Sequence, residues 1–230
     1  MALLEWRQAQ ALPVAPPLDV TMTVRRSPGP STPSVAEGAC PKYGVVAVGA
    51  SAGGLKSLFK LLGPLSATFP VSILVVLHIS PEHPSHLAEI LERKVALKVR
   101  QASDGELMLP GTVYVAAPNR HLVAEPSRVR LLETPTVHYS RPSIDLLFVS
   151  VAVSFGARSV GIVLSGSGRD GASGMRAIKM AGGVTMAEDP GKAEFSAMPY
   201  AAVATGCVDI VLPLSKLAAS LVDLCTVSHV

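Results

Sequence analysis

From Tyr43 onward, short runs rich in Val, Ala and Leu alternate with longer segments whose apolar residues recur at helical spacing. This alternation is typical of parallel strands joined by crossover helices. We therefore predict an α/β fold: a doubly wound, mainly parallel sheet with helices on both faces, in a Rossmann-like three-layer arrangement. The predicted strands are 43–50, 71–79, 159–166 and 183–188, and the predicted helices are 55–65, 86–95, 140–156, 171–183 and 215–225.

A hairpin and a tail complete the predicted organisation. Runs 112–117 and 120–125 flank a Pro-Asn turn, so we expect them to pair as a small antiparallel hairpin. Residues 1–41 concentrate Pro, Ser and Gly without any period, which predicts a flexible tail. Residues 42–230 are long enough for one core, and 49% hydrophobic with 16% charged residues suits a compact α/β domain.

Charge, hydropathy and cysteine spacing exclude several classes of protein. The formal net charge of +3 is small and the basic residues are not clustered, so we expect no nucleic-acid partner. No apolar run reaches the roughly 18 residues of a membrane helix, so we expect no membrane insertion. Cys40, Cys207 and Cys225 lie far apart, which favours neither disulfides nor a zinc ribbon and fits a reduced, cytoplasmic compartment.

The stretch VVAVGASAGGLKSL, residues 45–58, is compatible with two kinds of glycine-rich turn. A dinucleotide-binding turn needs G-x-G-x-x-G, but Ser51 stands at the second glycine, where the backbone must approach pyrophosphate. GASAGGLK also lacks the spacing and the Lys-Ser/Thr pair of a phosphate loop. The same residues fit G-x-S-x-G, a strand-to-helix turn that exposes a nucleophilic serine. A serine that caps the following helix is the structural alternative.

A base and an acid are expected at the same edge of the sheet. His78 ends the predicted strand 71–79, and Asp170 lies in the glycine-rich turn after the predicted strand 159–166. Because sites in doubly wound folds collect at the carboxyl ends of strands, Ser51, His78 and Asp170 are predicted to converge there. The alternatives are a histidine bonded to the backbone and an aspartate that caps the helix starting near Ala172.

Two further comparisons limit this hypothesis. His78, His83 and His86 suggest a metal site, but Pro81 and Pro84 interrupt the helix that would align two ligands, and we predict no metal. The chain order Ser, His, Asp differs from the Ser, acid, His order of α/β-hydrolases. Geometry rather than order defines such triads, so the order does not exclude one.

A longer series of motifs resembles the catalytic domain of the chemotaxis methylesterase family, the CheB-type protein-glutamate methylesterases. The resemblance covers about residues 44–224. Its landmarks are VGASAGG, LVVLHISP, ASDGELMLPGTVYVAAPNRHL, SRPSIDLLFVSVA, VGIVLSGSGRDGASGM and the later Met198-Pro199.

The resemblance implies hydrolysis of glutamate γ-methyl esters on cytoplasmic helices of chemoreceptors, with release of methanol and without a cofactor. Deamidation of receptor glutamines is a related activity. Ser51 would be the nucleophile, His78 the general base and Asp170 its orienting acid. The backbone N–H groups of Ala52 and Ser167 would bind the oxyanion.

Some features depart from the family pattern. Family members commonly have threonine after the nucleophile and methionine in the loop before the acid, where this chain has Ala52 and Ser167. Many also carry a receiver domain, which we expect to be absent in cis because only the Pro-rich tail precedes residue 42. Arg141 and Arg169 are predicted to be substrate-binding residues. A glutamine deamidase, another serine hydrolase and a non-catalytic signalling adaptor of the same fold stay open as alternatives.

Overall fold

The computed structural model describes residues 43–78, 85–137 and 139–226. In this part of the chain, a seven-stranded parallel sheet has the order β3-β4-β2-β1-β7-β8-β9, and β5 and β6 form a separate antiparallel pair. The strands are β1 Val45–Ala50, β2 Ser72–Leu77, β3 Lys98–Gln101, β4 Thr112–Val115, β5 His121–Ala124, β6 Val129–Leu132, β7 Ser159–Val163, β8 Val184–Glu188 and β9 Ile210–Leu212.

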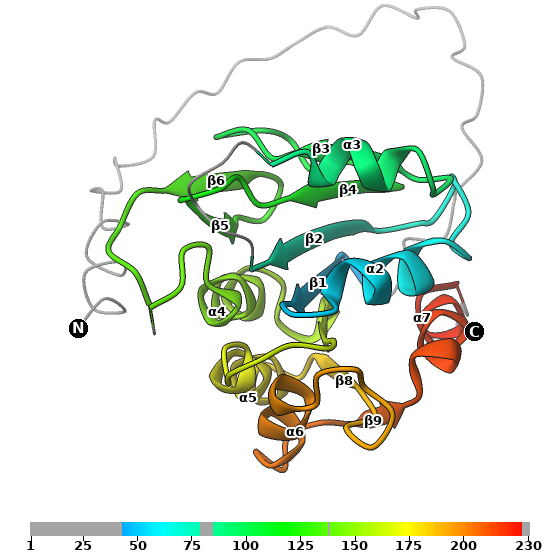
Figure 1. Cartoon of the computed structure of the whole chain (residues 1–230). Coiled ribbons are helices and arrows are strands. Elements are labelled where there is room, and N and C mark those ends of the chain that lie inside the picture. The colour runs from blue at the N-terminus through cyan, green and yellow to red at the C-terminus, as the bar shows by residue number, and fades with distance from the viewer. Residues whose placement is uncertain (1–42, 79–84, 138, 227–230) are drawn as a thin grey trace, which may run out of the picture. The chain divides into compact units, whose positions relative to one another are not determined.

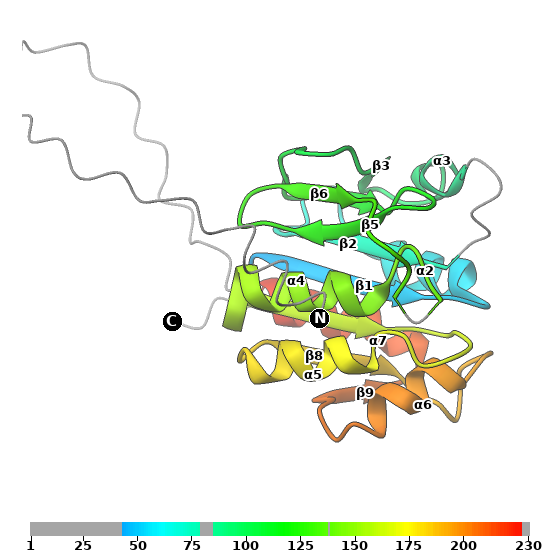
Figure 2. The ribbon, with the colours of Figure 1, turned by 90° about the vertical axis from the view of Figure 1, so that its left-hand side faces the viewer.

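The helices cover both faces of the sheet (Figure 1). They are α2 Gly54–Leu62, α3 Leu87–Glu92, α4 Ile144–Phe155, α5 Ala172–Met180, α6 Ala197–Val203 and α7 Leu214–Thr226, with a short 3-10 turn at Gly156–Arg158. Figure 1 shows α2 and α7 on one side of the central strands and α4 and α5 on the other. In Figure 2 the β5–β6 pair lies beside α4, where Ser150 Oγ of α4 accepts a hydrogen bond from Ala124 N.

The central strand β1 divides the core into two clusters. Val46 and Val48 pack in the cluster that contains the apolar residues of α2, α3 and α7. Val45 and Ala47 pack in the cluster that contains those of α4, α5 and α6. Because successive side chains of a strand point to opposite faces, a strand covered on both faces must be apolar throughout. The predicted three-layer α/β fold is confirmed.

The predicted pairing of residues 112–117 with 120–125 is wrong. Strand β4 lies between β2 and β3, so both of its edges already carry parallel ladders. The chain therefore leaves the sheet after β4, and β5 pairs with β6, with His121 opposite Leu132. An antiparallel hairpin is present, but it begins one strand later than predicted.

The direction of winding reverses at β1, because β2 lies on one side of it and β7 on the other. The turns after β1, β2 and β7 therefore meet at one crevice, where doubly wound folds bind their ligands. Ser51, His78 and Asp170 follow these three strands. In the described ranges no helix is long and apolar enough to cross a membrane. The predicted tail, 1–41, lies outside those ranges and stays a prediction.

Candidate active site

Ser51 lies in the tight turn between β1 and α2. Gly53 has a left-handed backbone with φ of 71°, a conformation that favours glycine. A Cβ on Gly54 would lie 2.5 Å from Leu77 Cδ1 and 2.8 Å from Ala50 Cβ, so glycine allows α2 to start close to the strands. The N-cap of α2 is Gly53, without a side-chain cap bond, so Ser51 does not cap this helix. The Ser51 hydroxyl is therefore not used as a helix cap.

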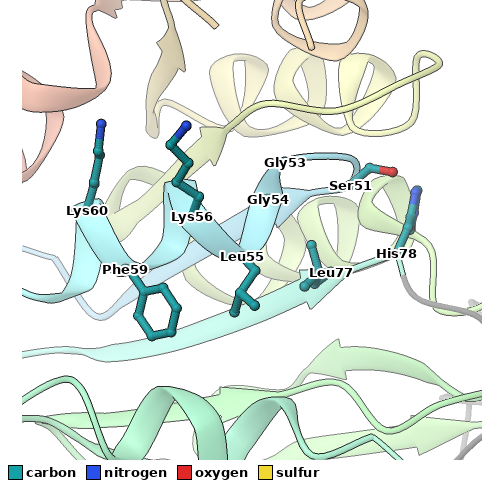
Figure 3. Close-up of a pocket in the computed structure, with 9 residues that line it drawn as sticks. All are labelled: Ser51, Gly53, Gly54, Leu55, Lys56, Phe59, Lys60, Leu77 and His78. Atoms are coloured by element: carbon teal, nitrogen blue, oxygen red, sulfur yellow. The ribbon is translucent and has the colours of Figure 1, made fainter. Parts of the chain in front are cut away.

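His78 lies beside this turn at the end of β2. Its backbone N–H donates to Ala50 O at 3.0 Å, and its side chain is 20% exposed. Ser51 and His78 line one cavity of about 590 Å³. Figure 3 shows the Ser51 hydroxyl directed toward the His78 ring. The candidate nucleophile and the candidate base therefore share one opening to solvent.

Asp170 contacts the ring of His78 from the buried side. Its Oδ2 lies 3.0 Å from His78 Nε2, and the two residues are 92 positions apart in the chain. Asp170 is an ionised acceptor, so Nε2 carries the proton and donates it. In neutral imidazole the other nitrogen, Nδ1, then holds the lone pair. The geometry therefore makes Nδ1 the basic atom of His78.

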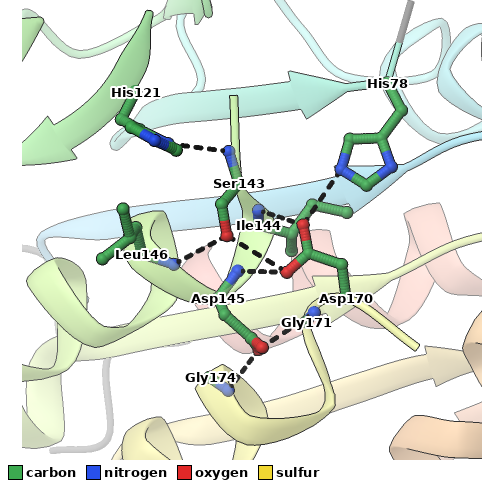
Figure 4. Close-up of polar contacts among 9 residues, drawn as sticks. All are labelled: His78, His121, Ser143, Ile144, Asp145, Leu146, Asp170, Gly171 and Gly174. Carbon is green, nitrogen blue, oxygen red and sulfur yellow. Dashed lines mark hydrogen bonds and ion pairs between the residues drawn. The ribbon is translucent and has the colours of Figure 1, made fainter. Parts of the chain in front are cut away.

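Backbone N–H groups at the start of α4 also hold the Asp170 carboxylate (Figure 4). Ile144 N donates to Oδ2 at 2.8 Å and Asp145 N to Oδ1 at 2.9 Å, while Ser143 Oγ donates to Oδ1 at 3.2 Å. Burial alone would raise the pKa of Asp170, but the hydrogen bonds from His78 and from these N–H groups outweigh it and hold the pKa below its ordinary value. The carboxylate is thus held negative and can offset the charge of a protonated His78 ring.

Asp145 provides the reverse contact. Asp145 lies in the first turn of α4. Its Oδ1 accepts from Gly171 N at 2.9 Å and Gly174 N at 2.7 Å, the first turn of α5. Asp145, in the first turn of α4, therefore caps α5, and Asp170, in the loop before α5, caps α4. The alternative that Asp170 caps the helix near Ala172 is wrong, because it caps α4.

The remaining predicted residues lie in different places. The guanidinium of Arg141 donates to Asn119 Oδ1 at 2.6 Å and 2.9 Å and to Thr134 O at 3.0 Å, in a second cavity of about 290 Å³. Arg169 and Ser167 are exposed in the loop before Asp170, and Ala52 is half-buried beside Ser51.

The predicted absence of a metal site concerns His78, His83 and His86. In the described ranges no cluster of His, Cys, Asp or Glu could hold a metal ion, and His83 lies outside those ranges.

This chain is similar in sequence to a family of known proteins. The model of the CheB methylesterase family matches residues 46–221, which include all three candidate catalytic residues. The chain belongs to the CheB methylesterase family. It is similar to the protein-glutamate methylesterase FrzG of Myxococcus xanthus, with 41% identity over 80% of this chain and 57% of the relative. It is also similar to protein-glutamate methylesterase/protein-glutamine glutaminase 1 of Cupriavidus pinatubonensis, with 40% identity over 79% and 53%.

A solved structure supports the same assignment. The CheB methylesterase catalytic domain of Thermotoga maritima matches with a TM-score of 0.75 and 32% identity, over 79% of this chain and 98% of that domain. This chain spans little more than half the length of the curated relatives, 57% of one and 53% of another. The similarity therefore concerns the catalytic domain of the CheB family.

His121 supports this CheB site from a position that the sequence motifs did not reveal. It is fully buried, and its Nδ1 accepts from Ser143 N at 3.1 Å while its Nε2 lies 3.1 Å from Pro135 O. Because Nε2 must donate to that carbonyl, His121 is neutral in this arrangement. Burial lowers its pKa below the ordinary 6.5. His121 therefore positions Ser143, which in turn bonds to Asp170.

The unfolding free energy of this chain should depend on pH through His121. The unfolded chain binds a proton at this residue near pH 6.5, whereas the folded chain binds it only at lower pH. Between these two pKa values the unfolded state holds more protons, so the unfolding free energy falls as the pH falls. The contribution of one group is at most about 1.4 kcal/mol per pH unit. Urea unfolding of wild type and of His121→Gln between pH 7.5 and 5 measures it.

The pH slope should be smaller in His121→Gln than in wild type. His86→Gln is the matched control, because His86 is exposed and pairs with Glu89 Oε2 at 3.3 Å. An equal slope in wild type and His121→Gln would contradict the assignment of a buried neutral imidazole.

Ser165 connects the nucleophile turn with the loop after β7. Its carbonyl accepts from Ser51 N at 3.0 Å. Its Oγ donates to Ala52 O at 3.0 Å and accepts from Phe195 N at 3.0 Å. Its N–H donates to Glu188 Oε2 at 2.9 Å, a carboxyl whose pKa is raised by burial and lowered again in part by this bond. Ser165 thus sets the orientation of the peptide groups on either side of Ser51.

The second prediction tests this arrangement. Ser165→Ala leaves Ala52 O and Phe195 N without their hydroxyl partner, so we expect a loss of about 1–3 kcal/mol of unfolding free energy. We also expect a lower kcat, because the turn that carries Ser51 loses a constraint. Ser165→Thr keeps the hydroxyl and should restore both. Denaturant unfolding and steady-state ester hydrolysis measure the two effects.

Ser159→Ala is the matched control. Ser159 is equally buried at the amino end of β7, the strand that precedes Ser165, and its Oγ donates to Gly156 O. This variant should lose stability and keep kcat. A similar loss of kcat in both variants would show that Ser165 acts on stability alone.

Proposed function

We propose that this chain is a protein-glutamate methylesterase that hydrolyses glutamate γ-methyl esters on the cytoplasmic helices of chemoreceptors. The observation that carries the proposal is the contact between His78 and Asp170 beside Ser51, in a chain of the CheB methylesterase family. In this proposal the protein acts in the cytoplasm, where those receptor helices lie. No cofactor takes part.

The reaction begins when His78 Nδ1 accepts the proton of Ser51 and the serine oxygen bonds to the ester carbonyl carbon. The Nε2–H donated to Asp170 keeps the imidazolium in place and offsets its charge. His78 then returns the proton to the methoxy oxygen, and methanol leaves an acyl-enzyme. Water, deprotonated by Nδ1, attacks the acyl carbon. The bond from this carbon to the Ser51 oxygen then breaks, His78 returns the proton to that oxygen, and the glutamate carboxylate is released.

The backbone N–H groups of Ala52 and Ser167 are assigned to the oxyanion hole. The neighbouring N–H groups of Ser51 and Gly166 donate to Ser165 O and Phe195 O. In the described part of the chain, those of Ala52 and Ser167 have no protein acceptor. Main-chain donors do not depend on the side chain, so the departure from threonine and methionine leaves them in place. Each such donor contributes on the order of a hundredfold in kcat.

Glutamine deamidation is the second candidate activity. The relative from Cupriavidus pinatubonensis is named a protein-glutamate methylesterase/protein-glutamine glutaminase. The same acyl-enzyme would form from a glutamine side chain, with ammonia rather than methanol as the leaving group. A non-catalytic adaptor is the weaker hypothesis, because it gives no reason for Asp170 to be held negative beside the His78 ring.

The test is release of volatile methanol from radiolabelled, methylated receptor membranes. We expect release that is proportional to the amount of protein. Conversion of receptor glutamine to glutamate, followed by mass spectrometry, reports deamidation in the same samples. Conversion without methanol would favour the second activity, and neither product would leave the adaptor hypothesis.

A further inference from the structure

The cavity that contains Ser51 and His78 extends along α2 (Figure 3). Its apolar lining includes Leu77 of β2 together with Leu55 and Phe59 of α2. Its charged lining on α2 consists of Lys56 and Lys60, within the described residues. The cavity is therefore apolar next to the nucleophile and bordered by positive charge.

The spacing of these residues arranges them as two parallel stripes. Leu55 and Phe59 are four positions apart, as are Lys56 and Lys60, and residues at this spacing lie on the same face of a helix. Figure 3 shows the two lysine side chains extending side by side from one edge of α2 and the two apolar side chains from the other edge. At 3.6 residues per turn, the two stripes are about 100° apart around the helix. Both stripes lead away from Ser51 in the same direction, so one elongated partner can contact both.

We propose that α2 binds the substrate as an amphipathic helix, with apolar side chains against Leu55 and Phe59 and carboxylates against Lys56 and Lys60. The proposal rests on the proposed function, because it names the part of the substrate that this site recognises beyond the ester itself. The recognised carboxylates are glutamates of the same substrate helix, one to two turns from the ester.

The dimensions of two adjacent helices fit this arrangement. Lys60 is six residues beyond Gly54, which is about 9 Å along α2 at 1.5 Å per residue. A glutamate four or seven positions from the esterified residue lies about 6 or 10 Å along the substrate helix. Residues four and seven positions apart also share one helix face. Both carboxylates therefore come within reach of the lysine stripe while the ester is at Ser51.

The lysines are available for such a partner. The side chain of Lys56 is 68% exposed and pairs with Glu194 Oε2 at 2.9 Å, and the side chain of Glu194 is itself 49% exposed. An exposed pair of this kind contributes little, so a substrate carboxylate can replace Glu194. Lys60 is exposed on the next turn of α2. Desolvation between two helices strengthens the new contacts relative to the exposed pair.

The experiment uses two synthetic helical peptides, each with one glutamate γ-methyl ester. In the first, the positions four and seven residues to either side are glutamate; in the second, they are lysine. We expect wild type to hydrolyse the first with a kcat/KM about tenfold higher, mainly through KM, since these contacts bind ground state and transition state alike. The preference should weaken as salt is added.

The double variant Lys56→Glu/Lys60→Glu should reverse the peptide preference, measured as the ratio of kcat/KM for the two peptides. Phe59→Ala should raise KM for both peptides, because both lose an apolar contact. Lys94→Glu/Lys98→Glu is the matched control, with the same change in net charge at exposed lysines near β3. It should keep the wild-type preference.

The outcomes separate this inference from the proposed function. Equal preference in wild type and Lys56→Glu/Lys60→Glu, or the same reversal in Lys94→Glu/Lys98→Glu, would overturn the role of α2. No methanol from either peptide would overturn the esterase proposal instead. In that case binding of the Ser51→Ala protein to the two peptides, by fluorescence anisotropy, decides the role of α2: a loss of preference with the two lysines reversed supports it, and no preference overturns it.

Discussion

Ser51→Ala is expected to lower kcat for methyl ester hydrolysis by about 10⁴- to 10⁶-fold, as loss of a triad nucleophile does in other serine hydrolases. Without the hydroxyl, His78 has no proton to accept and no acyl-enzyme can form. The folded state should be unaffected, because Ser51 does not cap α2 and its backbone hydrogen bonds with Ser165 and Gly54 involve main-chain atoms. Methanol release from labelled receptor membranes measures the loss.

Ser66→Ala is the control for this variant. Ser66 is an exposed serine beyond α2, and its hydroxyl contacts Thr68 Oγ1 at 3.0 Å. Ser66→Ala should release methanol at the wild-type rate. If Ser51→Ala, with an unchanged unfolding midpoint, also released methanol at that rate, the serine mechanism would be wrong.

Asp170→Asn is expected to lower kcat by about 10⁴-fold, the size of effect seen when a triad carboxylate is replaced by an amide. The amide carries no charge to offset the imidazolium of His78. Where its NH₂ replaces Oδ2, it also donates to Nε2, which moves the ring proton to Nδ1 and removes the lone pair that would accept the proton of Ser51.

The same variant should lose about 1–3 kcal/mol of unfolding free energy. In one orientation the NH₂ faces Ile144 N–H, and in the other it faces Asp145 N–H, so one donor at the start of α4 loses its acceptor. Asp145→Asn is the matched comparison, because Asp145 is a buried aspartate that accepts from Gly171 N and Gly174 N at the start of α5. It should lose similar stability and much less kcat. A smaller loss of kcat in Asp170→Asn than in Asp145→Asn would contradict the role of Asp170.

Long apolar strands could be predicted from the sequence, and short or polar ones could not. β1, β2, β7 and β8 were expected, because strands buried on both faces read as continuous apolar runs. β3 has the sequence KVRQ with one buried residue in four, so its pattern does not differ from that of a loop. The pairing of β4 also depended on which neighbours occupied its edges, which no local pattern reports.

The sequence likewise predicts some features of the candidate site and not others. Ser51, His78 and Asp170 could be placed at one edge because each lies at or just after the end of a predicted strand, and the carboxyl ends of parallel strands meet at one edge of the sheet. The amino-acid sequence does not indicate the contacts that orient these three side chains. The bond of His121 to Ser143 joins residues 22 positions apart, and that of Ser165 to Ala52 joins residues 113 positions apart. Neither His121 nor Ser165 stands in a pattern that indicates its partner.

By itself, then, the sequence determined the layers of the fold and which residue types reach the carboxyl edge, because hydrophobic period and glycine placement act over a few neighbouring residues. Only the tertiary structure decided which nitrogen of His78 is basic, which helix Asp170 caps and which face of α2 adjoins Ser51. These depend on distances between atoms that are far apart in the chain. Such distances follow from how the layers pack, and a linear pattern does not contain them.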